Sequence, residues 1–168
     1  MKLYYKPGAC SLASHIVLEE SGLSYETEAV DLKTKVTASG ADFVQINPKG
    51  YVPALVLDNG ELLTEGPAIL QCVADRVPEK KLAPANGTLE RYRLQSWLTF
   101  IGTELHRSCT PFFSPASGDA WKAAAMANLE RRLDYTNGEL AGKAYLLGDD
   151  FSVADAYLFT VLSWMPYL

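Results

Sequence analysis

The chain has 168 residues, of which 48% are hydrophobic and 21% charged, a composition typical of ordinary globular proteins. At this length it can bury one sizeable core or two small ones. Fifteen basic and 20 acidic side chains give a net charge of −5 without a run of five like charges, which argues against nucleic acid as a partner because no basic face is clustered.

The N-terminal residues read as a strand followed by a helix. Residues 2–5 are a short β-prone run that Pro7-Gly8 ends. Residues 11–20 carry apolar side chains at near-helical spacing, and Gly22 supplies the stop signal at the C-terminal end. A second strand is expected over residues 25–32, which gives a β-α-β start.

The next segment alternates again after a polar stretch. Residues 33–50 are poorly periodic, with only a weak helix signal around residues 41–45. Asp58-Asn59-Gly60 separates two apolar runs, residues 51–57 and 61–64, and Asn-Gly in that setting predicts an antiparallel hairpin. A helix then opens with Glu65-Gly66-Pro67, since proline is favoured at the first helical position, and runs to Arg76. The elements predict a small mixed sheet covered by helices.

The segment after this helix is rich in proline, glycine and charged residues, which is typical of an exposed linker between domains. We therefore expect two domains, residues 1–77 and 89–168, joined by a linker over residues 78–88. Everything beyond the linker looks helical. A long helix should end near Pro111. Its apolar side chains repeat at helical spacing, at Leu94, Trp97, Leu98, Ile101 and Leu105.

Two more helices follow. Residues 121–140 are rich in alanine and charge, and a third helix starts after Ser152, which is its expected N-cap. Asp155 stands three residues later and can bond back to the backbone N–H of the cap, an Asp variant of the capping box. Residues 156–164 are apolar nearly all round, so this helix should be buried on most faces.

The sequence also indicates the cellular compartment of the protein. The longest apolar stretch, residues 157–168, is too short to span a bilayer, and the N-terminus lacks the apolar run of a signal peptide, so we expect a cytoplasmic protein. Three widely spaced cysteines with no histidine cluster nearby argue against a disulfide scaffold and against a zinc site. Any cysteine that matters should act as a thiol.

Cys10 lies one residue before the first expected helix. The backbone N–H groups and the positive dipole end at a helix start stabilise a thiolate. Each unit by which the pKa falls below its usual value of about 8.5 raises the thiolate fraction nearly tenfold. The position suits thiol chemistry, although a single cysteine there is about as often a small buried residue.

Two further features point to ligand binding. The first is Pro53, which lies inside a strand-like run although proline has no N–H to donate to a neighbouring strand. A cis Val52–Pro53 bond would explain this proline and would present the Val52 backbone to an extended peptide-like ligand. The alternative is that a strand simply starts here. At the start of the next helix, backbone N–H groups can hold a carboxylate and Glu65 can hold an ammonium. Capping would be the more common role for Glu65.

Four segments in this order resemble the bacterial beta-class glutathione S-transferases, close to those of aromatic-degradation pathways. In chain order they are the run MKLYYKPGACSLASHIVLEE, the run NPKGYVPALVLDNGELLTEGPAI, the Pro-rich linker and the run FSVADAYLF. The resemblance covers the whole chain. It implies an N-terminal thioredoxin-like βαβ-ββα domain followed by a helical bundle domain.

The resemblance also implies site residues. Cys10 matches the characteristic active-site cysteine beside the glutathione sulfur, and Val52, before the expected cis Pro53, matches the residue whose backbone pairs with the cysteinyl unit. Glu65 and Gly66 match the pair that holds the γ-glutamyl end, although the family commonly has serine at the second position. Lys35 matches the lysine that reaches the glycyl carboxylate.

The long helix supplies the remaining candidates. Thr103, Glu104 and His106 match a Thr-Glu-Leu-His stretch near the thiol, with His106 a candidate hydrogen-bond donor to the sulfur. Thr99 stands where many relatives have asparagine. On an α-helix, positions 99, 103 and 106 share one face, which is more polar than the apolar stripe.

The function implied is a cytosolic glutathione transferase that uses glutathione as co-substrate and no metal. The glutathione thiolate would attack an electrophilic, aromatic or chlorinated small molecule, and a mixed disulfide with Cys10 would add thiol-transferase activity. The resemblance implies a homodimer without nucleic-acid or membrane partners. The alternative is a non-catalytic ligand-binding protein or an inactive copy.

Length bears on that alternative. Relatives continue with further helices beyond the one that ends here near Pro166, so the helical domain of residues 89–168 is expected to be incomplete. If the covering helices are absent, an apolar face should be exposed on the helix of residues 156–164.

Overall fold

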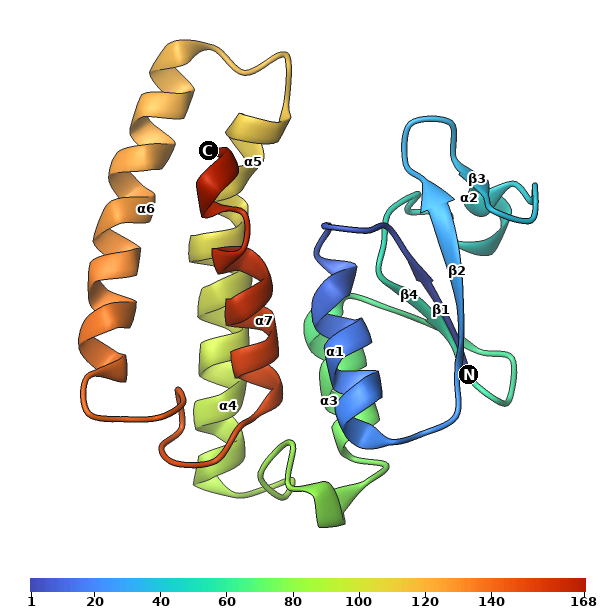
Figure 1. The fold of residues 1–168 in the computed structure, drawn as a ribbon, viewed down its shortest axis with the longest axis horizontal. Coiled ribbons are helices and arrows are strands. Elements are labelled where there is room, and N and C mark those ends of the chain that lie inside the picture. The colour runs from blue at the N-terminus through green and yellow to red at the C-terminus, as the bar shows by residue number, and fades with distance from the viewer. The chain divides into compact units, whose positions relative to one another are not determined.

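A five-stranded mixed sheet lies at the centre of residues 1–83 in the computed structural model, which describes residues 1–168 (Figure 1). The strand order is β3-β2-β1-β4-β5, with β1 and β2 parallel and the other neighbours antiparallel. The strands are β1 (Lys2–Tyr5), β2 (Glu26–Asp31), β3 (Val36–Thr37), β4 (Ala54–Val56) and β5 (Leu62–Thr64). Residues 84–168 form a second compact unit, which is helical.

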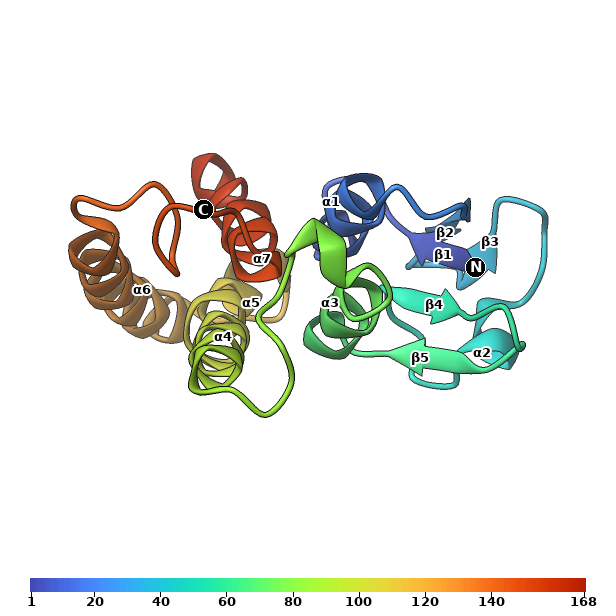
Figure 2. The same cartoon turned by 90° about the horizontal axis from the view of Figure 1, so that it is seen from below.

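Both faces of the sheet are covered. Helices α1 (Ser11–Ser21) and α3 (Gly66–Ala74) contact each other and lie together on one face (Figure 2), and α2 (Phe43–Ile46) packs on the other. Side chains alternate between the faces of a strand, so Leu3 and its cross-strand partner Leu55 lie opposite Tyr4 and Ala54. The core of the α2 face comprises Tyr4, Val30, Phe43, Val52 and Ala54.

The turns of this unit follow the sequence signals. Gly22 ends α1 in the left-handed conformation at φ 70°, and Leu57 N–H bonds to the Glu61 carbonyl across the turn that joins β4 to β5. Two details differ from expectation. Strand β4 begins at Ala54 rather than at Tyr51, and the polar stretch contains a short strand, β3, that pairs with β2.

The helices of residues 84–168 pack around one nearly continuous helical run. Helix α6 contacts α5 and the π segment, while α7 contacts α4 and the π segment (Figure 1). The bounds are α4 (Leu89–Phe100), the π segment (Ile101–His106), α5 (Arg107–Phe113), α6 (Asp119–Leu140) and α7 (Val153–Leu162), followed by a short 3-10 turn, Met165–Tyr167. Another 3-10 turn, Pro78–Lys80, belongs to residues 1–83.

The π segment corrects the expectation of an uninterrupted α-helix. Backbone bonds over Ile101–His106 widen to the i→i+5 pattern, and Pro111 lies inside α5 instead of ending it, so the run continues to Phe113. The predicted apolar stripe is nevertheless buried at Leu94, Leu98, Ile101 and Leu105.

The expected capping arrangement at α7 is confirmed. Asp155 accepts hydrogen bonds from the Ser152 N–H at 2.8 Å and from the Ser152 hydroxyl at 2.7 Å. Its other oxygen accepts from the Leu146 N–H at 2.8 Å, which ties the preceding loop to the helix.

The burial of α7 contradicts one expectation and confirms another. Its side chains are buried on most faces, as the apolar pattern predicts. Phe159 is the one large hydrophobic side chain of the helix that is exposed, at 59%. The large apolar side chains of Tyr157, Leu158, Val161 and Trp164 are buried. The exposed apolar face that an incomplete helical domain predicts is therefore absent.

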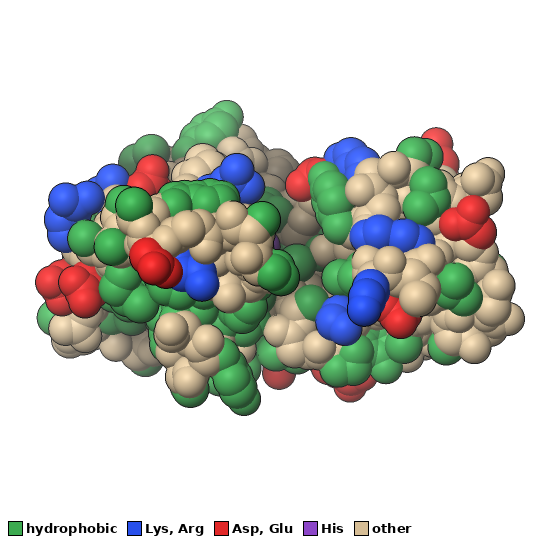
Figure 3. All heavy atoms as spheres, turned by 90° about the horizontal axis from the view of Figure 1, so that it is seen from above, with side chains coloured by type: hydrophobic (Ala, Val, Ile, Leu, Met, Phe, Trp, Pro, Cys, Tyr) green, Lys and Arg blue, Asp and Glu red, His purple; other side chains and the backbone are tan.

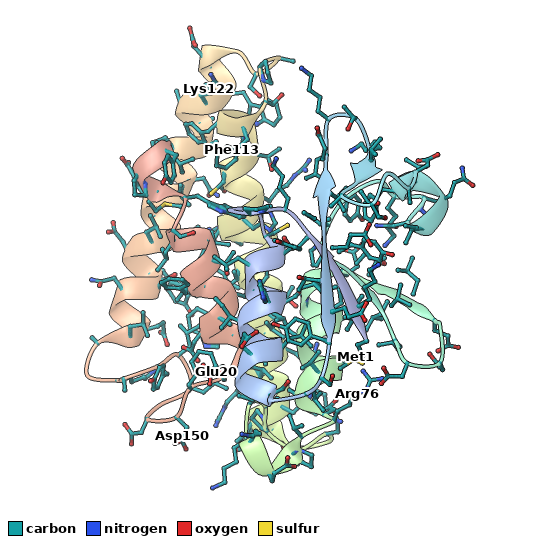
Figure 4. The ribbon with its side chains drawn as sticks, turned by 45° about the vertical axis from the view of Figure 1, so that its right-hand side comes forward. Met1, Glu20, Arg76, Phe113, Lys122 and Asp150 are labelled. Carbon is teal, nitrogen blue, oxygen red and sulfur yellow. The ribbon has the colours of Figure 1, made fainter.

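The charged surface is mixed. Figure 3 shows Lys and Arg side chains interspersed with Asp and Glu over the face in view. At the start of β1, Met1 lies beside Arg76, whose guanidinium bonds to the Met1 sulfur at 3.4 Å (Figure 4). None of the helices combines the length and the apolar character that crossing a membrane requires.

One ion pair inside the sheet makes stability depend on pH. Glu28 on β2 is paired with Lys2 on β1 and accepts from the Ser39 hydroxyl at 2.6 Å, with 9% of its side chain exposed. The lysine and then Ser39 lower the Glu28 pKa from 4.5 to about 2. Because the folded pKa lies below the unfolded one, the pair stabilises the fold above about pH 4.5, and this stabilisation is lost as the pH falls toward 2.

Replacing Glu28 with glutamine should therefore lower the free energy of unfolding by about 2 kcal/mol at pH 7. The gap from wild type should narrow below about pH 4.5 and close near pH 2. Urea denaturation across this range measures it, with the exposed Glu20→Gln on α1 as control. A gap that stays constant over the range would contradict the assignment.

Candidate functional site

Cys10 and Val52 meet at the start of α1. Cys10 is the N-cap residue of the helix, and its thiol donates a hydrogen bond to the Val52 carbonyl at 3.2 Å. The bond between Val52 and Pro53 is cis, which explains the proline inside this run. The Val52 N–H has no partner within the protein. A backbone donor left open in this way is one that an extended peptide can satisfy.

The protonation of Cys10 differs from the expectation. Burial raises the pKa of the thiol, and the nearby Glu65 carboxylate adds to this, while backbone N–H groups of the helix start act in the opposite direction. Desolvation is the largest influence, so it outweighs the helix start. Cys10 is therefore a protonated hydrogen-bond donor at neutral pH.

Lys35 reaches toward the same loop. Its ammonium donates to the Gly50 carbonyl at 2.7 Å, two residues before Val52. The backbone of Lys35 is left-handed, with φ 62°, a conformation that non-glycine residues seldom adopt. Buried Asn47 holds the loop itself, because its amide donates to the Tyr51 carbonyl at 2.7 Å and its side-chain oxygen accepts from the Lys49 N–H at 3.1 Å.

Glu65 and Gly66 stand at the N-terminus of α3. The backbone φ of Glu65 is also positive, at 72°. Its Oε1 accepts from the Lys49 ammonium at 2.5 Å and from the Tyr51 hydroxyl at 2.7 Å, and the lysine bond is the main reason that its pKa is lowered. The Gly66 N–H has no partner within the protein, as befits the first turn of a helix.

His106, at the end of the π segment, belongs to the second unit. Its Nδ1 lies 2.8 Å from the Tyr157 hydroxyl of α7, and the Trp164 ring packs edge-on at 4.9 Å between centroids. Burial is the main cause that lowers the His106 pKa, so the imidazole is neutral at neutral pH. A neutral imidazole carries one N–H, and a Tyr157 hydroxyl that donates to Nδ1 puts this hydrogen on Nε2.

The other candidates of this unit already have partners. The Thr103 hydroxyl donates to the Thr99 carbonyl at 2.9 Å, and Thr99 bonds one turn back to Gln95 in the same way. Glu104 is paired with Arg132 of α6 at 2.7 Å. The structure thus brings Cys10, Val52, Glu65 and Lys35 around one loop and helix-start region, while the candidates on the long helix lie in the separate unit.

Several residues at these sites carry no clear signal in the sequence. Lys49 and Tyr51 are partners of Glu65, and the only sequence signal for this is that all three lie in segments flanking the same hairpin. Arg132 and Tyr157 come from helices far along the chain, and nothing in the sequence pairs them with Glu104 and His106.

The remaining cysteines have structural surroundings. Cys109 is fully buried, its thiol bonds to the Leu105 carbonyl at 3.4 Å, and burial raises its pKa to about 11. Cys72 on α3 accepts from the Arg76 guanidinium at 3.3 Å. The structure has no group of three or more histidine, cysteine and carboxylate side chains arranged to hold a metal ion.

Two protein-family models match the chain. Residues 1–75 match the model described as the glutathione S-transferase N-terminal domain. Residues 100–168 match the corresponding C-terminal domain. Together the two matches span most of both structural units.

Individual relatives agree with these models. The chain is 50% identical over 164 residues to the glutathione S-transferase GstA of Escherichia coli O157:H7, covering 98% of this chain and 82% of that one. A sphingomonad glutathione S-transferase solved in complex with glutathione is 51% identical with a TM-score of 0.96, covering 99% of this chain and 83% of its own. A bacterial beta-class glutathione S-transferase of Sphingomonas chungbukensis is 50% identical with a TM-score of 0.95, at 99% and 83% coverage.

Proposed function

The chain belongs to the glutathione S-transferase family, and from this premise we propose that residues 1–83 bind glutathione in an extended conformation along Val52. The observation that carries the proposal is the unpartnered Val52 N–H beside the Cys10 thiol. The cysteinyl unit of glutathione would accept from this N–H as a neighbouring strand does, which brings the glutathione sulfur next to Cys10.

Charged groups on either side of Val52 suit the two ends of the peptide. We propose that the Glu65 carboxylate takes the γ-glutamyl ammonium and that the Gly66 N–H, at the positive end of α3, takes the γ-glutamyl carboxylate. Gly66 supplies the backbone donor without the hydroxyl of a serine. At the other end, Lys35 would exchange the Gly50 carbonyl for the glycyl carboxylate.

The chemistry is nucleophilic attack by the glutathione sulfur. Its thiol loses a proton, the thiolate forms a C–S bond with the electrophilic carbon, and the leaving group departs from an aromatic or chlorinated substrate. Protonated Cys10 can donate to this thiolate and so stabilise it. Holding both reactants together removes much of the entropic part of the barrier.

From the family resemblance alone, we propose that His106 is a second hydrogen-bond donor to the sulfur. The Tyr157 contact at Nδ1 bears only on which ring nitrogen carries the hydrogen, and leaves Nε2–H as the donor. Thr99, Thr103 and Glu104 would then support the helix rather than bind the peptide, because their side chains are engaged within the second unit. The intact cation–carboxylate pair of Glu104 with Arg132 is the clearest case.

We further propose that the protein belongs to the beta class, forms a homodimer and serves detoxification in the cytoplasm. A cysteine at the start of α1 and the likeness to the Sphingomonas chungbukensis enzyme support the class. All three cysteines are free thiols, which the reducing cytoplasm preserves. The homodimer rests on the family resemblance alone.

The test combines binding with turnover. The chain should be retained on glutathione resin and should conjugate glutathione to an activated chloronitrobenzene. In that assay Glu65→Gln should raise the KM for glutathione about tenfold with little change in kcat, because a charge-assisted contact to the ligand is worth about 1.5 kcal/mol or more. Glu61→Gln, a nearby exposed carboxylate on the hairpin, serves as control and should leave KM unchanged.

Other outcomes discriminate the alternatives. Retention without turnover would favour the non-catalytic ligand-binding protein. Failure of the wild-type chain to bind glutathione would contradict both functions. An unchanged KM in Glu65→Gln would remove Glu65 from the proposed site.

A further inference from the structure

The carboxylate expected to receive the ligand's ammonium already holds an ammonium of the protein. Lys49 Nζ lies 2.5 Å from Glu65 Oε1 and 3.0 Å from the Thr64 hydroxyl. The Tyr51 hydroxyl binds the same Glu65 oxygen at 2.7 Å, while Oε2 accepts no hydrogen bond. The lysine thus stands where the γ-glutamyl ammonium of glutathione would sit.

This ion pair is accessible to a ligand. The Lys49 and Glu65 side chains are 46% and 55% exposed, respectively, so both charges are in contact with water. A surface ion pair of this kind is weak, because water screens it and two side chains must be held in place. A ligand that supplies one charge to each partner can replace the pair at little cost.

The γ-glutamyl end of glutathione supplies both charges. Its α-carbon carries one ammonium and one carboxylate, and the protein pair offers one carboxylate and one ammonium side by side. The exchange turns one ion pair into two without leaving a charge unpaired. From this matching we propose that Lys49 is a recognition residue, which leaves Glu65 when glutathione binds and pairs with the γ-glutamyl α-carboxylate.

The loop around Lys49 suits this movement. Asn47 fixes the backbone on both sides, through the Lys49 N–H at 3.1 Å and the Tyr51 carbonyl at 2.7 Å. The four-carbon side chain of a lysine is flexible, and its ammonium acts as a point charge without a required direction. A small rotation of the side chain is enough to move the ammonium from the Glu65 carboxylate to a carboxylate bound beside it.

Tyr51 would keep Glu65 oriented during the exchange. Its hydroxyl remains on Oε1 when the lysine leaves, and its ring lies 5.9 Å from the Lys49 ammonium. The site would therefore select peptides whose first residue is a free γ-linked amino acid with both α-groups. This inference rests on the proposed function, since it concerns how the same site recognises glutathione.

The opposing possibility is that Lys49 only competes with the ligand's ammonium. The two roles predict opposite results for Lys49→Met when two peptides are compared by calorimetric titration of the full chain. One peptide is glutathione. The other is 4-aminobutyryl-Cys-Gly, which keeps the amine and lacks the α-carboxylate.

Lys49→Met should weaken glutathione binding about threefold to fivefold, and it should leave binding of the aminobutyryl peptide unchanged or tighter. Lys49→Arg should restore glutathione binding, because the charge is retained. Lys33→Met, which removes an exposed lysine elsewhere in the same unit, should change neither affinity. Thermal unfolding of each variant checks that the fold is intact.

Tighter binding of both peptides by Lys49→Met would show competition alone and overturn the proposal. Equal weakening of both, or no change in either, would overturn it as well. Failure of the wild-type chain to bind glutathione is a separate result, because it would contradict the proposed function itself.

Discussion

Replacing Cys10 with alanine should lower thiol–disulfide exchange at least a hundredfold and should reduce glutathione conjugation less than tenfold. The difference follows from the two roles that the thiol can take. In the proposed exchange Cys10 would be the nucleophile, and no other group could form its covalent bond. In the proposed conjugation it would only donate a hydrogen bond to the glutathione sulfur, and one such bond contributes on the order of 1 kcal/mol.

The exchange that we propose would take two steps. The Cys10 thiolate would attack the glutathione sulfur of a mixed disulfide substrate, forming a Cys10–glutathione disulfide and releasing the substrate thiolate. A second glutathione thiolate would then attack this disulfide, which would release oxidised glutathione and restore the Cys10 thiolate. Because burial raises the pKa of the Cys10 thiol, the rate should rise with pH through the alkaline range.

The measurement uses a mixed disulfide of glutathione with a small thiol, followed beside conjugation in the same preparations. Cys72→Ala is the matched control, since Cys72 lies on α3 and is also partly exposed. It should leave both activities unchanged. Exchange that persists in Cys10→Ala would show that Cys10 is not the nucleophile.

Replacing Asp155 with alanine should lower the free energy of unfolding by about 3 kcal/mol, because a carboxylate that accepts three hydrogen bonds is lost. Two of these donors are backbone N–H groups of Ser152 and Leu146, residues that are 4% and 2% exposed. Left without an acceptor, they carry the full cost of desolvation. The same carboxylate joins the loop before α7 to the helix, so both should loosen together.

Urea denaturation followed by circular dichroism measures this loss, with a melting temperature expected to fall by roughly 10 °C. Asp155→Asn keeps an acceptor oxygen and should lose about half as much. Asp134→Ala, an exposed aspartate on α6, should stay within about 0.5 kcal/mol of wild type. A comparable loss in the Asp134 variant would show that the effect does not come from the cap.

Local rules account for the parts of the fold that the sequence predicts well. Asn59-Gly60 specifies its turn and Ser152 with Asp155 specifies a helix start within four residues, and both are observed. Strand β3 has only two residues, Val36 and Thr37, which pair with the end of β2 across a short turn, and so short a run leaves no alternating pattern in the sequence. The π segment likewise leaves the apolar stripe in place, so periodicity alone does not reveal it.

The candidate site shows the same division. Its positions can be read from motifs, but its electrostatics depend on neighbours distant in sequence. The helix start at Cys10 suggests a lowered thiol pKa, whereas burial, which is invisible in the sequence, reverses the direction. Glu65 is visible as a lone carboxylate at a helix start, and only the structure supplies Lys49 and Tyr51 beside it.

Lys35 and Glu65 both have a positive φ, a backbone conformation that costs thermal stability. Only one other non-glycine residue, Lys81, has a positive φ, so two of the three such positions are the proposed anchors for the two ends of glutathione. A side chain in this conformation costs roughly 1–2 kcal/mol, which glycine would recover. Glycine would also remove the charge that each anchor provides. Engineering for heat resistance alone would therefore favour replacing the two residues on which ligand recognition is proposed to depend.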